Sequence, residues 1–301
     1  MHYPSDPLQP GPIYFLTPRK CGLFGVCCEA FPRQVTYLVD EAMDTGKGAN
    51  TVVSYVHHYI ENHGVNASII HLNADNCTGQ NKNNTLIQYL AWRVLTHRNK
   101  SIKISFLPVG HTKFSPDWCF GLIKQLFRKT TVGCLDDIAK VVDDSAVVNV
   151  SQLVGSSTGE VFVQCFDWTG FLQCFFKRID GIKKIHHFTL EKDSLLQGDF
   201  LAQESISSSI RKVSFLRDDV TLPPSDTLPE VVPPKGLSAE RQWYLYEKIR
   251  SFCPDNSKDM TCPFPSVAKP SSSAHHTPEA PSLAGISMGV PPAPKRRRKQ
   301  Q

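Results

Sequence analysis

An acid at the end of a predicted strand opens a loop of amide and hydroxyl side chains. Asp75 follows the apolar run 67–72 and precedes residues 76–83, Asn-Cys-Thr-Gly-Gln-Asn-Lys-Asn. Open α/β sheets bind ligands beyond the carboxyl ends of their strands. A loop of this composition can hydrogen-bond phosphate and sugar without reading base sequence. The alternative is that Asp75 only caps the next helix. The candidate nucleic-acid contacts in this loop are Asn76, Gln80, Asn81 and Lys82.

A second acid, Asp117, lies in the first turn of the predicted helix that follows the predicted strand 102–109. We expect that helix to begin with Ser115 as N-cap and Pro116 as its first residue. The ends of neighbouring parallel strands lie about 5 Å apart, so Asp75 and Asp117 could face the same spot. Carboxylates are the ligands that Mg²⁺ and Mn²⁺ prefer, and two such ions assist phosphodiester cleavage. Alternatively, Asp117 only stabilises the N-terminus of its helix.

Basic residues follow Asp117 along the same helix. Lys124, Arg128 and Lys129 would meet phosphates if nucleic acid binds there, and would otherwise form a solvated face. The chain carries a net charge of +5. A compact part of it lies near the C-terminus as Lys295, Arg296, Arg297, Arg298 and Lys299. Such a run is typical of a nuclear-import signal or a nucleic-acid patch, so we expect a nuclear, or nuclear and cytoplasmic, protein.

Hydrophobic periodicity predicts the elements that hold these residues. The first three strands, joined as hairpins and followed by right-handed crossovers, would give one mixed sheet covered by helices. The β-like signal returns after residue 145. The predicted strands are 12–16, 23–28, 35–39, 67–72, 102–109, 160–166 and 184–190. The predicted helices are 49–63, one that carries Leu86, Ile87, Leu90, Val94 and Leu95 on one side, 116 to about 130, and 238–252.

Composition divides the chain into a core, an extension and a tail. We expect an α/β core over 1–145 and a β-rich extension of the same domain over 146–220. Fourteen of the 22 prolines lie after residue 220, so 221–301 is predicted to be a Pro-rich linker with one short helix and a disordered basic tail. No apolar stretch approaches the ~20 residues of a spanning helix, so no membrane partner is expected. The ten cysteines are expected to be reduced thiols, because no secretory signal is recognised.

Two long motifs carry a family resemblance. Asp-Asn-Cys-Thr-Gly-Gln-Asn-Lys-Asn at 75–83 and Gly-His-Thr-Lys-Phe-Ser-Pro-Asp-Trp-Cys-Phe-Gly at 110–121 resemble a domain of uncharacterised, transposon-derived animal proteins. That domain is similar to the RNase H-like core of DDE transposases and retroviral-type integrases. The resemblance covers roughly residues 2–262.

The resemblance implies an RNase H-like mixed sheet flanked by helices and a DNA partner. It makes Asp75 and Asp117 the catalytic, metal-binding acids, with Mg²⁺ or Mn²⁺ as cofactor. A metal-bound water or a 3′-hydroxyl would then attack phosphorus. His111 and Lys113, just before the second acid, would contact phosphate or assist the leaving group. As a bare pattern they are equally a loop histidine and a solvated lysine.

This sequence departs from the family pattern at the first of the catalytic acids. An RNase H-like core of the DDE kind carries its first catalytic acid on the first strand, which lies beside the fourth strand. The predicted strand 12–16 has no acid, and Asp40 ends the third predicted strand. In the RNase H-like order that the resemblance implies, the third strand lies at the sheet edge, two strands from the fourth. We therefore expect a core without its first strand and an incomplete metal site. Two hypotheses follow: a nucleic-acid-binding transposase-type core, active or inactive, and a non-catalytic domesticated interaction module that binds DNA or protein. No protein partner is indicated.

Overall fold

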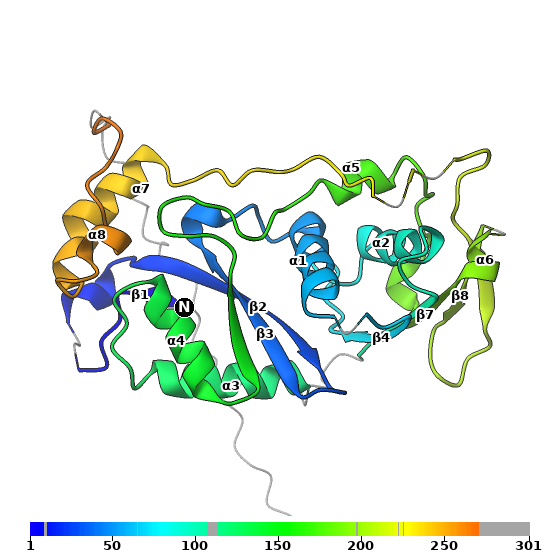
Figure 1. The fold of residues 1–301 in the computed structure, drawn as a ribbon, viewed down its shortest axis with the longest axis horizontal. Coiled ribbons are helices and arrows are strands. Elements are labelled where there is room, and N and C mark those ends of the chain that lie inside the picture. Colours follow the sequence, from blue (N-terminus) through cyan, green and yellow to red (C-terminus); the bar gives the residue numbers. More distant parts are fainter. Residues whose placement is uncertain are drawn as a thin grey trace, which may run out of the picture.

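The computed structural model describes residues 1–8, 11–64, 66–107, 114–196, 198–221, 223–224 and 226–270. They form a mixed α/β fold, as predicted, with two mixed sheets flanked by helices (Figure 1). The prediction of one continuous sheet is wrong, since the strands divide into a four-stranded and a five-stranded sheet. None of the helices in these described ranges is long and apolar enough to cross a membrane.

The first sheet is built on a long antiparallel hairpin. β2 pairs with β3 over eight residue pairs, from Cys21 opposite Asp40 to Cys28 opposite Arg33. β6 adds to β3 in parallel, and β1 pairs with only the first two residues of β2. The order is β1-β2-β3-β6. The strands are β1 (His2–Tyr3), β2 (Arg19–Cys28), β3 (Arg33–Asp40) and β6 (Asn149–Leu153).

The second sheet begins with a parallel pair and continues as an antiparallel meander. β4 and β5 are parallel neighbours, and β7, β8 and β9 follow in antiparallel order. The strands are β4 (Ile69–Ala74), β5 (Ser101–Phe106), β7 (His187–Glu191), β8 (Asp199–Gln203) and β9 (Arg211–Ser214).

Helix α1 (Ala49–Asn62) connects the two sheets by covering both from one side. Its Tyr55 and Tyr59 pack with β2 and β3, while Val53 and Val56 pack in the core of the second sheet. The remaining helices on this side of the second sheet are α2 (Asn84–Leu95), α5 (Trp168–Leu172) and α6 (Lys192–Leu196), which share its core. Figure 1 shows α1 and α2 lying above β4 and β7.

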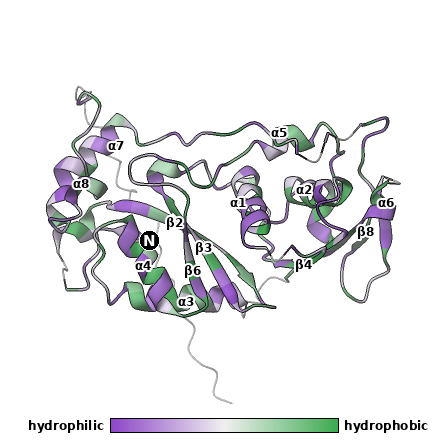
Figure 2. Ribbon diagram, in the orientation of Figure 1, coloured by the Kyte–Doolittle hydropathy of each residue, from purple (hydrophilic) through white to green (hydrophobic). Residues whose placement is uncertain are grey.

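Helices α3 (Ser115–Phe127) and α4 (Leu135–Ser145) cover the opposite side of the first sheet. Ile123 of α3 and Ile138 of α4 pack with Leu38 of β3 and Cys21 of β2, which point away from α1. Hydrophilic and hydrophobic colours alternate along both helices in Figure 2, as expected for helices with one buried face. The first sheet is therefore sandwiched between helices.

The C-terminal helices return to the start of β2. Arg19 donates to the carbonyl of Thr261 at 2.8 Å, and Arg241 forms an ion pair with Glu41 at 2.9 Å. Ser238 caps the first of these helices, in agreement with the helix predicted over 238–252. They are α7 (Ala239–Tyr244), the π-turn η4 (Leu245–Ile249), the 3₁₀ turn η5 (Arg250–Phe252) and α8 (Lys258–Thr261).

Two predicted strands are wrong. The run 12–16 is a 3₁₀ helix, η1 (Pro12–Phe15), whose Tyr14 and Phe15 are exposed, because no neighbouring strand pairs with it. Residues 160–166 follow an irregular path with isolated bridges at Val161 and Phe166. Two further 3₁₀ turns are η2 (Glu41–Met43) and η3 (Ile182–Lys184). The elements α4, α5, α6, β6, β8 and β9 were not predicted, and residues 271–301, including the predicted basic tail, lie outside the described residues.

Candidate nucleic-acid interface

Asp75 follows directly on β4 at the carboxyl edge of the second sheet. The parallel register pairs Ala74 with Phe106, and the Leu107 amide donates to the Ala74 carbonyl at 3.0 Å. The prediction that β4 and β5 are parallel neighbours is therefore confirmed. Asp75 is exposed, and its Oδ1 accepts from the Cys77 amide at 3.0 Å and from Asn81 Nδ2 at 2.7 Å. One carboxylate oxygen thus holds the loop in shape.

The rest of this loop is partly used for its own structure. Asn83, and not Asp75, caps α2, because its Oδ1 accepts from the Leu86 amide at 3.0 Å. Asn76, Gln80 and Asn81 are half-buried. These three amides remain at the surface and keep their predicted role as candidate contacts.

Lys82 lies inside the protein. Its side chain is 1% exposed, its Nζ donates to the Lys183 carbonyl at 2.8 Å, and it lies 5.5 Å from the centre of the Phe106 ring. Burial lowers the pKa of this ammonium group. Lys82 therefore ties the loop to the segment before β7 and does not present its charge to a ligand at the surface.

Helix α3 presents an exposed face with one aromatic ring and several cations. Trp118 is 60% exposed, Lys124 is exposed on the same helix, and Arg128, the C-cap, and Lys129, the next residue, are exposed at its end. Asp117 is an exposed acid of the first turn, as predicted. We call Trp118, Lys124, Arg128 and Lys129 the α3 stripe. Trp118 was missed from sequence, although its spacing from the buried Cys119 and Ile123 indicates the outer face.

The predicted start of α3 is corrected by one residue. Phe114 is the N-cap, Ser115 is the first helical residue and Pro116 is the second. The Ser115 hydroxyl donates to Glu29 Oε1 at 2.8 Å, at the turn between β2 and β3. This bond holds the N-terminus of α3 beside the tip of that hairpin. His111 and Lys113, the two other predicted site residues, lie outside the described residues.

The described residues do not fit a divalent-metal centre. Among them, no group of three or more His, Cys, Asp or Glu side chains lies close enough to hold a metal ion. Asp75 already uses Oδ1 within its loop. Asp40, the other acid at a strand end, is 1% exposed and bound by Arg19 and Tyr3. The metal-binding role of Asp75 and Asp117 remains a prediction, because the described residues supply no third ligand beside them.

Residues 20–206 match the family described as domain of unknown function DUF7869. The chain belongs to this family. No curated protein and no solved structure matches the chain. The match runs from β2 to the end of β8, so the Asp75 loop and the α3 stripe are both inside the DUF7869 domain.

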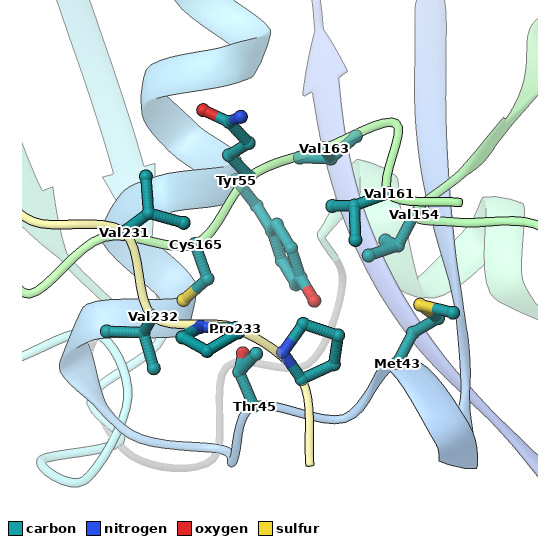
Figure 3. A pocket seen from close by; sticks show the side chains of 12 residues that line it. Met43, Thr45, Tyr55, Val154, Val161, Val163, Cys165, Val231, Val232 and Pro233 are labelled. Atoms are coloured by element: carbon teal, nitrogen blue, oxygen red, sulfur yellow. The ribbon is translucent and has the colours of Figure 1, made fainter. Parts of the chain in front are cut away.

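A cavity of about 130 Å³ lies between the DUF7869 domain and the C-terminal segment, against α1 and the first sheet (Figure 3). Tyr55, Val154 and Val163 contribute to its apolar wall, and Val231 with Pro233 closes it from the C-terminal segment. Sites for small molecules usually measure about 300–1,000 Å³. None of the predicted site residues lines this cavity. The apolar cavity is therefore too small for a nucleotide or cofactor.

Proposed function

We propose that this DUF7869 chain is a nucleic-acid-binding protein, with DNA as its partner, built on an RNase H-like core of transposon origin. The observation that carries the proposal is the α3 stripe. An exposed indole ring stands on the same helix as Lys124, and Arg128 and Lys129 follow at the C-terminal end of that helix. Cations that track a phosphate backbone, together with an aromatic ring that stacks on a base, are the usual means of sequence-tolerant binding.

The strand order supports the RNase H-like part of the proposal. The resemblance expects the third strand at an edge, the second beside it, and the first between the second and the fourth. Here β3 lies beside β2, and β2 is on the side of the first sheet that faces β4, where the second sheet begins (Figure 1). The expected edge position of the third strand is wrong, because β6 pairs with β3 on its other side. α1 packs against both halves, as one helix crossing a continuous sheet would. No described strand lies between β2 and β4.

Binding is the function proposed, and we derive no metal-dependent step. The donor set around Asp75 and Asp117 is incomplete within the described residues. The exposed stripe needs no metal to contact phosphate, because Lys and Arg carry their charge at neutral pH. Trp118 would stack on an unpaired or terminal base, and Lys124 and Arg128 would contact the phosphates beside it.

The test is a titration of labelled DNA with the full chain, followed by fluorescence anisotropy. Lys124→Glu/Arg128→Glu is expected to weaken binding roughly tenfold or more, since each lost contact removes released counterions. The matched control is Lys235→Glu/Lys248→Glu, which changes the net charge equally at two exposed lysines of the C-terminal segment. Equal affinities for the two double variants would contradict binding through α3.

A further inference from the structure

Two cysteines of the C-terminal segment face each other in its interior. Cys253 is the C-cap of η5 and Cys262 is the C-cap of α8, and their sulfur atoms lie 3.8 Å apart. Cys253 is 5% exposed, whereas Cys262 is completely buried. Both lie outside residues 20–206, the region that matches DUF7869. Because the sulfur atoms are already in contact, they need to approach by less than about 2 Å to reach the bonding distance of a disulfide.

The turn of chain between the two cysteines fixes both of them in position. The Cys253 amide donates to the Arg250 carbonyl at 3.1 Å, and the Cys262 amide donates to the Lys258 carbonyl at 2.9 Å. The Arg250 guanidinium closes the turn, since its Nη1 donates to the Lys258 carbonyl at 3.0 Å and to the Cys262 carbonyl at 2.7 Å. The contact between the two thiols is therefore held by backbone bonds on both sides.

The two thiols differ in acidity. The hydrogen bond from the Cys262 thiol is the largest cause that lowers the pKa of Cys253. The positive charges of Arg250, Lys258 and Arg19 lower it further. The same bond, followed by burial, raises the pKa of Cys262. Cys253 therefore ionises first, and the thiolate is the reactive form of a cysteine. It is also the cysteine of the pair with some exposed surface.

We infer that Cys253 and Cys262 are a redox-sensitive pair that a peroxide oxidises to a disulfide. The Cys253 thiolate attacks one oxygen of hydrogen peroxide, the O–O bond breaks, and hydroxide leaves the new sulfenic acid. The Cys262 sulfur then attacks the Cys253 sulfur, the S–O bond breaks, and water leaves with the Cys262 proton. The hydroxide takes up the proton that Cys253 had released. Two thiols thus lose two electrons and two protons, and one peroxide becomes two water molecules.

The disulfide would act on a part of the C-terminal segment that contacts the DUF7869 domain. Thr261 precedes Cys262, and its hydroxyl donates to the Gly133 carbonyl at 2.7 Å. The Thr261 carbonyl accepts from Arg19 Nη1 at 2.8 Å. A cross-link removes more conformations from a detached segment than from a docked one. Oxidation is therefore expected to strengthen the docking of α8 on the DUF7869 domain.

A reversible disulfide agrees with the nuclear or cytoplasmic location predicted from the sequence. Glutathione and thioredoxin keep thiols reduced in these compartments, and the disulfides that form there are usually transient and catalytic or redox-sensing. Exchange with a reducing thiol returns the pair to two thiols. The inference does not depend on nucleic-acid binding, because none of the α3 stripe residues takes part in it.

The test detects the disulfide directly in the native full chain. The chain is treated with hydrogen peroxide, unfolded, alkylated with iodoacetamide, digested with trypsin and analysed by mass spectrometry. Trypsin cleaves after Lys258, so the disulfide joins two separate peptides, one with Cys253 and one with Cys262. We expect this joined pair after peroxide and two alkylated peptides after dithiothreitol. The control Cys77→Ser/Cys174→Ser removes two exposed thiols and should give the same yield.

Three results of this experiment would overturn the inference. They are alkylation of both cysteines after peroxide, sulfinic acid at Cys253 without a disulfide, and pairing of either cysteine with a different one. Because the measurement uses the native chain, it does not depend on the folding of a variant.

Hydrogen exchange measures the consequence for docking. The amides of Thr261 and Cys262 are hydrogen-bonded to carbonyls of the same turn. In the oxidised native chain they should exchange up to roughly hundredfold more slowly than in the reduced chain, as expected for a closed loop of about ten residues. Cys253→Ser should show no difference between the two conditions. Equal exchange in the oxidised and reduced native chain would contradict the strengthened docking.

Discussion

Arg19 and Asp40 form a two-point ion pair in the interior of the protein. Arg19 Nη2 lies 2.6 Å from Asp40 Oδ1, and Arg19 Nε lies 2.9 Å from Oδ2. The Tyr3 hydroxyl donates to the same Oδ2, and burial together with Asp40 raises the pKa of Tyr3. Asp40 is the last residue of β3, a position where an acid could be catalytic. Its two oxygens instead bind Tyr3 of β1 and Arg19 of β2, and so hold the three strands together.

Removing Asp40 should therefore destabilise the fold. Asp40→Ala leaves the guanidinium of Arg19 buried without its partner, which typically costs about 3–5 kcal/mol. Urea unfolding measures this loss, with the exposed Asp226→Ala as control. The pair Arg19→Met/Asp40→Leu should recover part of the stability, because no unpaired charge remains. Unfolding of Asp40→Ala at the urea concentration of the native chain would show that the pair is not structural.

Stability should fall in mild acid because of His57. Burial lowers the pKa of His57 to about 4, and its Nδ1 lies 3.1 Å from the Tyr89 hydroxyl. The unfolded chain titrates near 6.5, so between these values the unfolded state binds more protons and stability decreases as pH falls. From about pH 7.5 to about pH 5, His57 alone should cost about 2 kcal/mol.

The variant His57→Gln isolates this contribution. Its free energy of unfolding should lose about 2 kcal/mol less than that of the native chain over the same pH interval. Because the other histidines are common to both proteins, the difference reports His57. Parallel pH profiles for the two proteins would contradict a buried, neutral His57.

Lys82 should contribute little to DNA affinity, although it lies in a loop whose amides are candidate contacts. Lys82→Met replaces a buried ammonium by an apolar chain of similar volume, which is often neutral or stabilising. We expect its affinity for DNA to stay within about twofold of native, while Lys124→Met loses more. A loss for Lys82→Met equal to that for Lys124→Met would mean that Lys82 reaches the ligand.

Nuclear import is predicted to depend on the C-terminal basic run. Replacing Lys295, Arg296, Arg297, Arg298 and Lys299 by alanine in a fluorescent fusion of the full chain should shift it from the nucleus to the cytoplasm. Microscopy measures the nuclear fraction, and the control replaces Ser271, Ser272, Ser273 and His275 by alanine. An unchanged distribution would remove this segment as the signal.

Local sequence pattern predicted the elements whose periodicity is strong. β3, α1 and α2 were found because their apolar residues repeat with strand or helix period. The strand predicted over 12–16 is wrong because it rested on the aromatic residues Tyr14 and Phe15. Aromatic residues favour strands only where a neighbouring strand can pair with them. The division into two sheets depends on pairing between distant residues, which no local window contains. β8 and β9 are too short to show a clear period.

The candidate site was predicted where position along a strand determines it. Asp75 lies at the carboxyl end of the parallel strands because it directly follows β4. The parallel register of β4 and β5 agrees with this predicted position. The burial of Lys82 was not predictable, because a polar loop gives no sign that one cation turns inward to the Lys183 carbonyl. The alternation Ser-Ile-Lys-Ile-Ser-Phe of β5 indicates a strand with one buried and one solvent-facing side, as the structure shows.

The most direct test of nucleic-acid binding is the salt dependence of DNA affinity for the native full chain. If Lys124, Arg128 and Lys129 each contact one phosphate of a duplex, the log–log slope should be about −2.7, at about −0.9 per contact. Anisotropy titrations at four or more salt concentrations measure it. An affinity that is absent at low salt, or that does not change with salt, would contradict the account.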